Sequence, residues 1–308
     1  MHRESIVFIE RHDRAAEGCL LFAPDDILAV TSAAADVTYR EGADYLVDRR
    51  AGRLVRAAGS RMPEIRPDSI GTLLHDRVVA VTYNHSGDSS RPPETAGTLT
   101  RVTARLKRGE PVTICLAGDS ISAGYDVSGF HRVPPYQPAF GELVAIALEQ
   151  QYGAPVRLHN LATAGWTAAD AVWDTARIAA QEPDLVIIAF GMNDAGYADA
   201  GEFVGNVSSV MHRVRADVAD VEFVIVSPML PTPECSWIIP ARFAEYRAAL
   251  AGLTGEGVAL ADVTGLWTEL VARKNPYDLS GNGLNHPNDF GHRIYAHAIL
   301  DRLVVWRT

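Results

Sequence analysis

Five apolar, strand-like runs in the carboxyl two thirds of the chain constrain its fold more than any other feature. Segments of helical period separate the runs, such as the one marked by Phe140, Val144 and Leu148. Each run is apolar on both faces, as a strand must be when helices cover both sides of a parallel sheet. With right-handed crossovers, the pattern predicts an α/β fold: a flavodoxin-like three-layer α/β/α sandwich with a five-stranded parallel sheet. The runs span 112–117, 156–162, 185–190, 222–227 and 258–263.

The amino-terminal part of the chain has a different period. Short β-type runs broken by turn residues, among them Ile6–Ile9 and Val37–Tyr39, fill residues 5 to about 85, a spacing typical of a small β-sandwich. The stretch Asp48–Arg53 predicts a hairpin loop in which Gly52 takes a positive φ. Ser, Pro and Gly are frequent in 84–97, which indicates a connection. We therefore expect an N-terminal β-sandwich domain with its connection over 1–97, and an α/β domain over 98–308.

Charge and cysteine usage narrow the classes of partner and compartment. The formal net charge of −10 argues against a nucleic-acid or anionic-membrane partner, because such binding relies on clustered Lys and Arg. No run approaches the ~18 apolar residues of a membrane span, and the amino terminus does not fit a secretory signal. Cys19, Cys115 and Cys235 are widely spaced, which predicts reduced thiols. These features favour a cytoplasmic protein.

Four polar blocks follow in chain order, and the first three come directly after strand-like runs. They are centred on Ser120, Gly165, Asn193 and His286. Ligands bind at the carboxyl ends of strands in open α/β sheets, so the first three blocks are expected to lie where a ligand binds. A serine hydroxyl is a poor nucleophile without a base within hydrogen-bond reach, and histidine suits that task near neutral pH. The four blocks therefore indicate nucleophilic catalysis.

The blocks resemble those of the SGNH subgroup of the GDSL hydrolases, from about Pro111 to the end of the chain. The family's invariant Ser, Gly, Asn and His match Ser120, Gly165, Asn193 and His286. The resemblance implies the three-layer fold and a serine esterase with Ser120 as nucleophile and His286 as base. It also implies an oxyanion hole formed by the backbone N–H groups of Ser120 and Gly165 and the side chain of Asn193. Losing one such donor typically costs about 10²–10³ in rate.

The chain departs from the family at the third triad member. The family's last block reads Asp-x-x-His, but this chain has Gly283 where the aspartate would stand. A backbone carbonyl, for example that of Gly283, could orient His286 in a Ser–His dyad by accepting its Nδ1–H. Alternatively, an acid is supplied from elsewhere in the chain, with Asp278 and Asp289 nearest in sequence, or the enzyme is weakened. We favour the dyad, because Asp278 lies well upstream of His286 and Asp289 falls in the first turn of a final helix expected over roughly 288–304.

Two further acidic residues and several aromatic residues surround the blocks. Asp119 and Asp194 are expected to accept loop N–H bonds and hold their turns, not to complete the triad. Aromatic faces with hydrogen-bonding neighbours suit a sugar ring that carries a small acyl ester. The side chains expected to bind substrate are Tyr125, His131, Trp166 and Trp237.

The resemblance to family members with an added β-domain points to a carbohydrate acetyl esterase. We expect a small acylated substrate, a sugar ester, and leave homo-oligomerisation open. No cofactor or metal is expected, because His286, His292 and His297 do not match His-Glu-x-x-His and the cysteines lack zinc spacing. Two alternatives remain. One is an esterase, thioesterase or lysophospholipase-type enzyme acting on a non-sugar ester. The other is a glycan-binding protein with a vestigial hydrolase domain, which only the missing Asp at position 283 supports.

Overall fold

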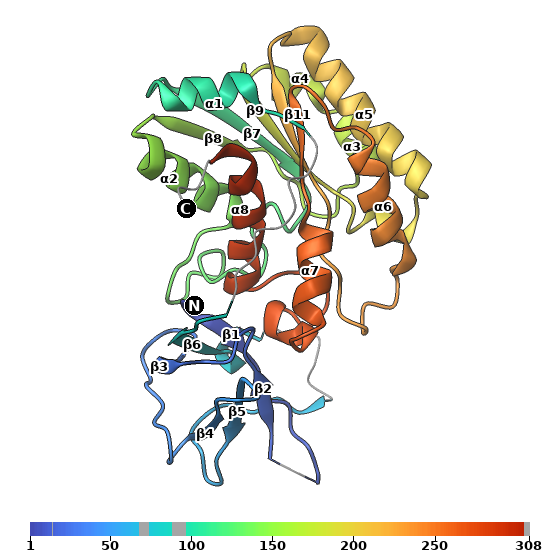
Figure 1. Cartoon of the computed structure of the whole chain (residues 1–308). Coiled ribbons are helices and arrows are strands. Elements are labelled where there is room, and N and C mark those ends of the chain that lie inside the picture. The colour runs from blue at the N-terminus through green and yellow to red at the C-terminus, as the bar shows by residue number, and fades with distance from the viewer. Residues whose placement is uncertain (14, 68–73, 88–96, 305–308) are drawn as a thin grey trace.

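The larger part of the chain is a five-stranded parallel sheet between two layers of helices (Figure 1). The computed structural model describes residues 1–13, 15–67, 74–87 and 97–304. The strand order β11-β10-β9-β7-β8 is that of a flavodoxin-like fold, so the predicted α/β architecture is confirmed. All residues of β9, β10 and β11 are buried, as the two-faced apolar runs predict. The strands are β7 (Val112–Gly118), β8 (Val156–Asn160), β9 (Leu185–Ala189), β10 (Glu222–Val226) and β11 (Val258–Ala261).

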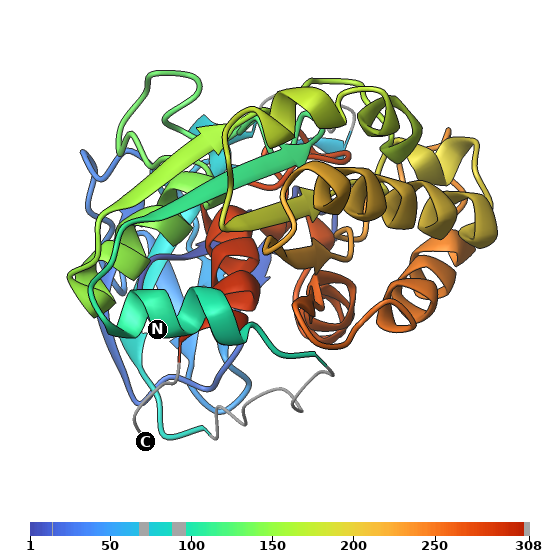
Figure 2. The ribbon, with the colours of Figure 1, turned by 90° about the horizontal axis from the view of Figure 1, so that it is seen from above.

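Helices cover both faces of this sheet. Helices α2 and α8 pack together on one face, and α3, α4 and α5 pack together on the other (Figure 2). The last helix begins where the Asn288 side chain accepts a hydrogen bond from the Gly291 backbone N–H at 3.0 Å. The helices are α1 (Thr100–Lys107), α2 (Phe140–Tyr152), α3 (Ala168–Val172), α4 (Thr175–Ala179), α5 (Ala200–Asp217), α6 (Ala241–Ala251), α7 (Val263–Val271) and α8 (Asp289–Leu303).

The amino-terminal part contains two antiparallel sheets of three strands each, with orders β1-β6-β3 and β2-β5-β4. Gly52 has a φ of +63° in the turn between β4 and β5, as predicted. The run at 37–39 was expected to be a strand, but it forms only a single bridge, between Thr31 and Thr38. Most of the expected connection lies outside the described residues, and the division after residue 97 stays a prediction. The strands are β1 (Glu4–Ile6), β2 (Glu17–Cys19), β3 (Asp26–Ser32), β4 (Tyr45–Asp48), β5 (Arg53–Arg56) and β6 (Val79–Asn84).

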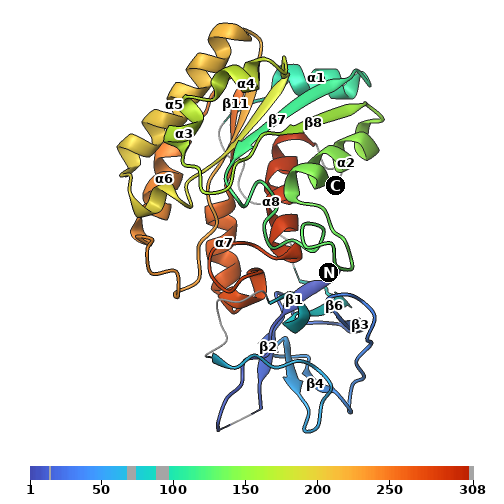
Figure 3. The same ribbon diagram turned by 180° about the vertical axis from the view of Figure 1, so that it is seen from behind.

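A buried cluster of charges joins the two parts. The two amino-terminal sheets, β1 to β6, are here called the β region. Strand β1 lies on the side of the β region that faces α7 and α8 (Figures 1 and 3). Glu4 of β1 accepts a 2.6 Å hydrogen bond from Lys274 Nζ, and Asp278 lies 3.4 Å from the same ammonium group. All three side chains are almost fully buried. Removing one partner from such a cluster typically costs about 3–5 kcal/mol, because it leaves an uncompensated buried charge. The β region is therefore firmly docked on the segment that precedes His286.

Two further findings concern the length of the helices and the state of the cysteines. None of the helices within the described ranges is long and apolar enough to cross a membrane. The three cysteines, Cys19, Cys115 and Cys235, are free thiols. Burial raises the pKa of the Cys115 thiol to about 12 and that of Cys235 to about 11. Both buried thiols are therefore poor nucleophiles near neutral pH.

Candidate active site

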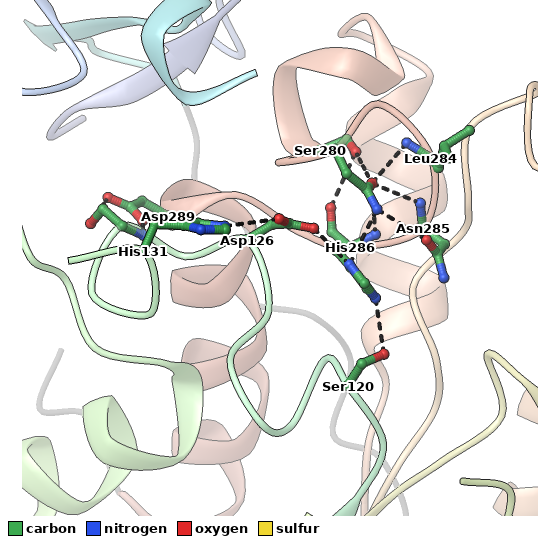
Figure 4. A network of polar contacts seen from close by, with 10 residues as sticks. Ser120, Asp126, His131, Ser280, Leu284, Asn285, His286 and Asp289 are labelled. Atoms are coloured by element: carbon green, nitrogen blue, oxygen red, sulfur yellow. Dashed lines mark hydrogen bonds and ion pairs between the residues drawn. The ribbon is translucent and has the colours of Figure 1, made fainter. Parts of the chain in front are cut away.

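Ser120 and His286 are 166 residues apart in the sequence, yet their side chains meet in the structure. Ser120 lies in the turn directly after β7, at the carboxyl edge of the sheet. Its Oγ lies 2.9 Å from His286 Nε2 (Figure 4). Gly118 allows this turn to be tight, because a Cβ there would lie 2.5 Å from the Cβ of Ser122. The hydroxyl therefore has a base within hydrogen-bond reach, the first requirement for a serine nucleophile.

His286 is held by an ordered loop between the short 3₁₀ helix at Pro276–Leu279 and α8. The Asn282 side-chain Oδ1 accepts backbone N–H groups from Leu284, Asn285 and His286, at 2.9, 3.1 and 3.2 Å. The Gly281 backbone N–H donates to the His286 carbonyl at 2.9 Å. From the amino-terminal part of the chain, the Leu74 N–H donates to the Gly281 carbonyl at 2.7 Å. The imidazole is therefore carried on a backbone that is fixed from several sides.

Asp126 is the partner of the other imidazole nitrogen. Its Oδ2 lies 2.6 Å from His286 Nδ1. Asp126 belongs to the loop after Ser120 and has a left-handed backbone conformation, with a φ of +66°. The Asn282 amide nitrogen lies 3.1 Å from the same Nδ1. Because the Asn282 Oδ1 already accepts three N–H groups, its amide nitrogen is a donor, so the acceptor for an Nδ1–H is Asp126.

The expected dyad with the Gly283 carbonyl is wrong. That carbonyl accepts a hydrogen bond from the Thr232 hydroxyl at 2.7 Å instead. The two carboxylates nearest in sequence are also occupied elsewhere. Asp278 is buried and accepts the Val7 N–H at 2.7 Å, whereas Asp289 accepts the Ser128 N–H and hydroxyl at 2.7 and 2.8 Å. The carboxylate beside His286 Nδ1 therefore comes from a distant loop, because both carboxylates near His286 in sequence bind other groups.

The contact between the Asp126 and His286 loops explains the glycine at position 281. A Cβ at Gly281 would lie 2.6 Å from the Cβ of Asp126 and 2.7 Å from its carbonyl oxygen. Real Cβ atoms essentially never approach other atoms so closely. Gly281 is therefore required because the Asp126 loop packs directly against the His286 loop.

This contact leads to a test by Gly281→Ala. The added methyl group should displace Asp126 from His286, and misplacement of a catalytic group by about 1 Å can cost about 10²-fold in rate. We expect a loss of that order in kcat toward p-nitrophenyl acetate. Gly205→Ala is the matched control, because it lies within α5 and a Cβ there meets nothing within 4 Å. Equal kcat values for both variants would contradict the predicted role of the contact.

Asp126 is ionised near neutral pH. Burial alone would raise the pKa of its carboxyl group, but hydrogen bonds from His286 and His131 outweigh burial and hold the pKa below its usual value. The second bond joins Asp126 Oδ1 to His131 Nε2 at 3.0 Å. The side chains of Asp126 and His286 are only 13% and 14% exposed. An ionised carboxylate in such a sheltered place interacts strongly with an imidazolium.

The glycine and asparagine blocks also reach this edge of the sheet. Gly165 has a φ of +83°, and a Cβ there would meet nothing within 4 Å, so its backbone borders open space. The Asn193 side-chain Nδ2 donates to the Trp166 carbonyl at 2.8 Å, which links the two blocks. A primary amide carries two N–H donors, so one remains for another acceptor.

Asp119 and Asp194 hold the turns of their blocks. Asp119 accepts the Ile121 N–H at 2.9 Å. Asp194 accepts the N–H groups of Ala168 and Gly191 at 2.9 and 3.0 Å. Burial raises the pKa of Asp119 to about 7 and that of Asp194 to about 6. Neither carboxylate hydrogen-bonds His286 in the described residues, so both act on loop geometry.

The residues expected to bind substrate have different surroundings. The Tyr125 ring lies edge-on to the His286 ring, with centroids 5.6 Å apart. Trp166 is partly buried, and the Arg177 guanidinium lies 5.8 Å from its ring centroid. Trp237 is 49% exposed, and its carbonyl lies next to Gly196, in the segment after Asn193.

His131 is bound to Asp126 and is therefore not simply a pocket-lining side chain. No group of three or more His, Cys, Asp and Glu side chains that could hold a metal ion occurs in the part of the chain that the structure describes.

A family comparison covers the residues of this site. The sequence model of the GDSL-like lipase/acylhydrolase family matches residues 116–294, more than half of the 308 residues. The matched span includes Ser120, Gly165, Asn193 and His286, and also Asp126. No curated protein matches the chain.

Several solved structures share the fold. A two-domain esterase (CEX) active on acetylated mannans, co-crystallised with mannopentaose, is 20% identical with a TM-score of 0.51; the match covers 66% of this chain and 52% of that one. The acetylxylan esterase Axe2 from Geobacillus stearothermophilus is 20% identical with a TM-score of 0.50, over 65% of this chain and 97% of that one. The lipase Lip_vut3 from a goat rumen metagenome is 14% identical with a TM-score of 0.50, over 62% and 97%. The matched part of the two-domain esterase is thus about half its length.

Proposed function

The chain belongs to the GDSL-like lipase/acylhydrolase family and is a carboxylic ester hydrolase, and we propose that it hydrolyses small acyl esters through a Ser120–His286–Asp126 triad. The observation that carries the proposal is the unbroken series of contacts among the three side chains, at 2.9 and 2.6 Å. Asp126 accepts the Nδ1–H of His286 and so leaves the Nε2 lone pair directed at the Ser120 hydroxyl. This is the geometry that the reaction of a serine hydrolase requires.

Acylation follows from these contacts. The Ser120 Oγ attacks the carbonyl carbon of the ester while its proton passes to His286 Nε2. The carbonyl oxygen becomes an oxyanion, for which the Ser120 and Gly165 backbone N–H groups and the free N–H of Asn193 are the donors. The Asp126 carboxylate stabilises the imidazolium that forms. When the intermediate collapses, the bond to the alcohol oxygen breaks and His286 returns the proton to that oxygen.

Deacylation uses the same groups in reverse. A water molecule attacks the acyl carbon and gives one proton to His286. Collapse of the second intermediate breaks the bond to Ser120 Oγ, which recovers the proton from His286. The products are the carboxylic acid and the free enzyme, and no further reactant is needed.

For the substrate we propose an acetyl ester on a carbohydrate. Structural neighbours named as esterases of acetylated mannans and of acetylxylan support this substrate class, although at 20% identity the likeness itself extends only to the fold. The aromatic side chains of Tyr125 and Trp237 also support it, because rings with polar neighbours suit a sugar. The glycan-binding alternative loses its only support, because Asp126 supplies the carboxylate that is missing at position 283.

A substrate screen tests this proposal. Acetylated xylo- and manno-oligosaccharides would be compared with p-nitrophenyl esters of acetyl, butyryl and octanoyl groups. We expect kcat/KM to be highest for acetyl esters, and higher for acetylated oligosaccharides than for p-nitrophenyl acetate. A preference for octanoyl esters would instead favour a lipase-type enzyme that acts on a non-sugar ester.

A further inference from the structure

The carboxylate of Asp126 lies between two imidazole rings. His286 Nδ1 is 2.6 Å from its Oδ2, and His131 Nε2 is 3.0 Å from its Oδ1 (Figure 4). We propose that His131 is a positioning residue of the esterase reaction, which holds the Asp126 carboxylate in place against His286. This inference rests on the proposed triad. It gives the site a fourth residue that acts through the acid and does not touch the substrate.

Asp126 needs such support because, within the described residues, no backbone N–H group binds its carboxylate. It lies in a loop, in the left-handed region that side chains other than glycine seldom adopt. Asp119 and Asp194 are each held by backbone N–H groups. By contrast, within the described residues both hydrogen bonds to the Asp126 carboxylate come from imidazoles. His131 is therefore the group that fixes the oxygen facing away from His286.

The His131 ring is itself well placed to act as an anchor. It packs edge-on against the Phe130 ring, with centroids 5.4 Å apart. The centroid of the Phe130 ring lies 4.5 Å from that of the Tyr125 ring. Tyr125 in turn contacts the His286 ring. The loop closes behind His131, where the Gly129 N–H donates to the Gln137 carbonyl at 2.9 Å. These contacts connect the two histidines through packed rings as well as through the carboxylate.

Proton positions follow from the same arrangement. A carboxylate only accepts hydrogen bonds, so both imidazole nitrogens that face it carry protons. His131 is then a donor through Nε2, and neutral His286 is a donor through Nδ1. Nε2 of His286 remains the acceptor for the Ser120 hydroxyl. A donor to Oδ1 is thus what position 131 must supply, and a positive charge is not required.

Three variants test the requirement for a donor. His131→Leu removes the donor and should lower kcat by about 10²-fold, because Asp126 is no longer fixed, while KM changes little. In His131→Gln the amide nitrogen occupies nearly the position of Nε2 and should restore most of the activity. His131→Asn is too short to reach Asp126 and should resemble the leucine variant. Thermal unfolding of all three variants shows whether each one folds. If His131→Leu is unstable, the activities of His131→Asn and His131→Gln still compare a side chain that cannot reach Asp126 with one that can.

A double-mutant cycle tests whether His131 acts through Asp126. In an Asp126→Ala background no carboxylate is left to hold, so His131→Leu should cause no further loss. An equal loss in both backgrounds would overturn the proposal, because His131 would then act by another route. A change confined to KM would also overturn it and would place His131 on the substrate.

A measurement without substrate separates this inference from the proposed function. A proton shared between His286 Nδ1 and Asp126 gives a strongly deshielded NMR resonance. We expect to observe this resonance in the wild type. It should shift or broaden in His131→Leu and return to its wild-type position and width in His131→Gln. An unchanged resonance in His131→Leu would overturn the positioning role. A wild-type rate of hydrolysis by Ser120→Ala would instead refute the proposed function. The NMR spectrum would then still test whether His131 holds Asp126 against His286.

Discussion

Asp126→Ala should lower kcat toward p-nitrophenyl acetate by about 10⁴-fold, the usual cost of losing the acid of a serine triad. Without the carboxylate, the Nδ1–H of His286 loses its 2.6 Å partner and the imidazolium loses its counter-charge. KM should change much less, because Asp126 contacts His286 and His131, not the ester. Initial rates at saturating substrate, with thermal unfolding as a check of folding, measure the effect.

Asp289→Asn is the informative control for this variant. Asp289 is closer to His286 in sequence than Asp126 is, but its carboxylate is bonded to Ser128. We expect this substitution to keep most of the activity, because an Asn side chain can still accept the Ser128 N–H. A loss of about 10⁴-fold in Asp289→Asn together with normal activity in Asp126→Ala would contradict the assignment of the acid.

Ser120→Ala should lower kcat by about 10⁶-fold, because the variant lacks the hydroxyl that lies 2.9 Å from His286 Nε2. The methyl group leaves His286 and Asp126 in position but provides no oxygen for attack. Rates measured with purified protein at high enzyme concentration give the residual activity. Ser122→Ala is the matched control, since Ser122 is fully buried and its hydroxyl lies 3.4 Å from the Ala189 carbonyl.

Two outcomes would count against the nucleophile. Comparable turnover in Ser120→Ala and wild type would end the assignment of Ser120. A loss of equal size in Ser122→Ala would show that the turn after β7 tolerates no change, and the effect at Ser120 would then not identify a nucleophile. Variants of one turn therefore have to be compared with each other.

The α/β fold could be predicted from the sequence because its signal is local and repeated. Each strand-like run and each helical segment can be recognised within about ten residues, and their order leaves few topologies. The pairing of Ser120 with His286 was also predictable, because the four blocks resemble those of a family in which the matching residues are nucleophile and base. The run at 37–39 shows the limit, because its β-type residues found only one bridging partner.

The acid of the site could not be predicted in the same way. Asp126 and His286 are 160 residues apart, on two loops whose conformations no periodic pattern specifies. In the sequence, Asp126 is an ordinary loop aspartate, and nothing distinguishes it from the other aspartates that could supply an acid from elsewhere in the chain. The burial of Lys274 is a second feature that could not be predicted from the sequence. A lone lysine near a helix end is usually exposed, whereas Lys274 is buried between Glu4 and Asp278.

Covalent labelling tests the central claim most directly. A fluorophosphonate reacts with an activated serine when the hydroxyl oxygen attacks phosphorus and fluoride leaves. Peptide mapping by mass spectrometry after brief exposure would locate the adduct. The account predicts rapid labelling of the peptide that contains Ser120, much slower labelling in Asp126→Ala, and none at that position in Ser120→Ala. Labelling of another residue, or an equal rate in Asp126→Ala and wild type, would contradict it.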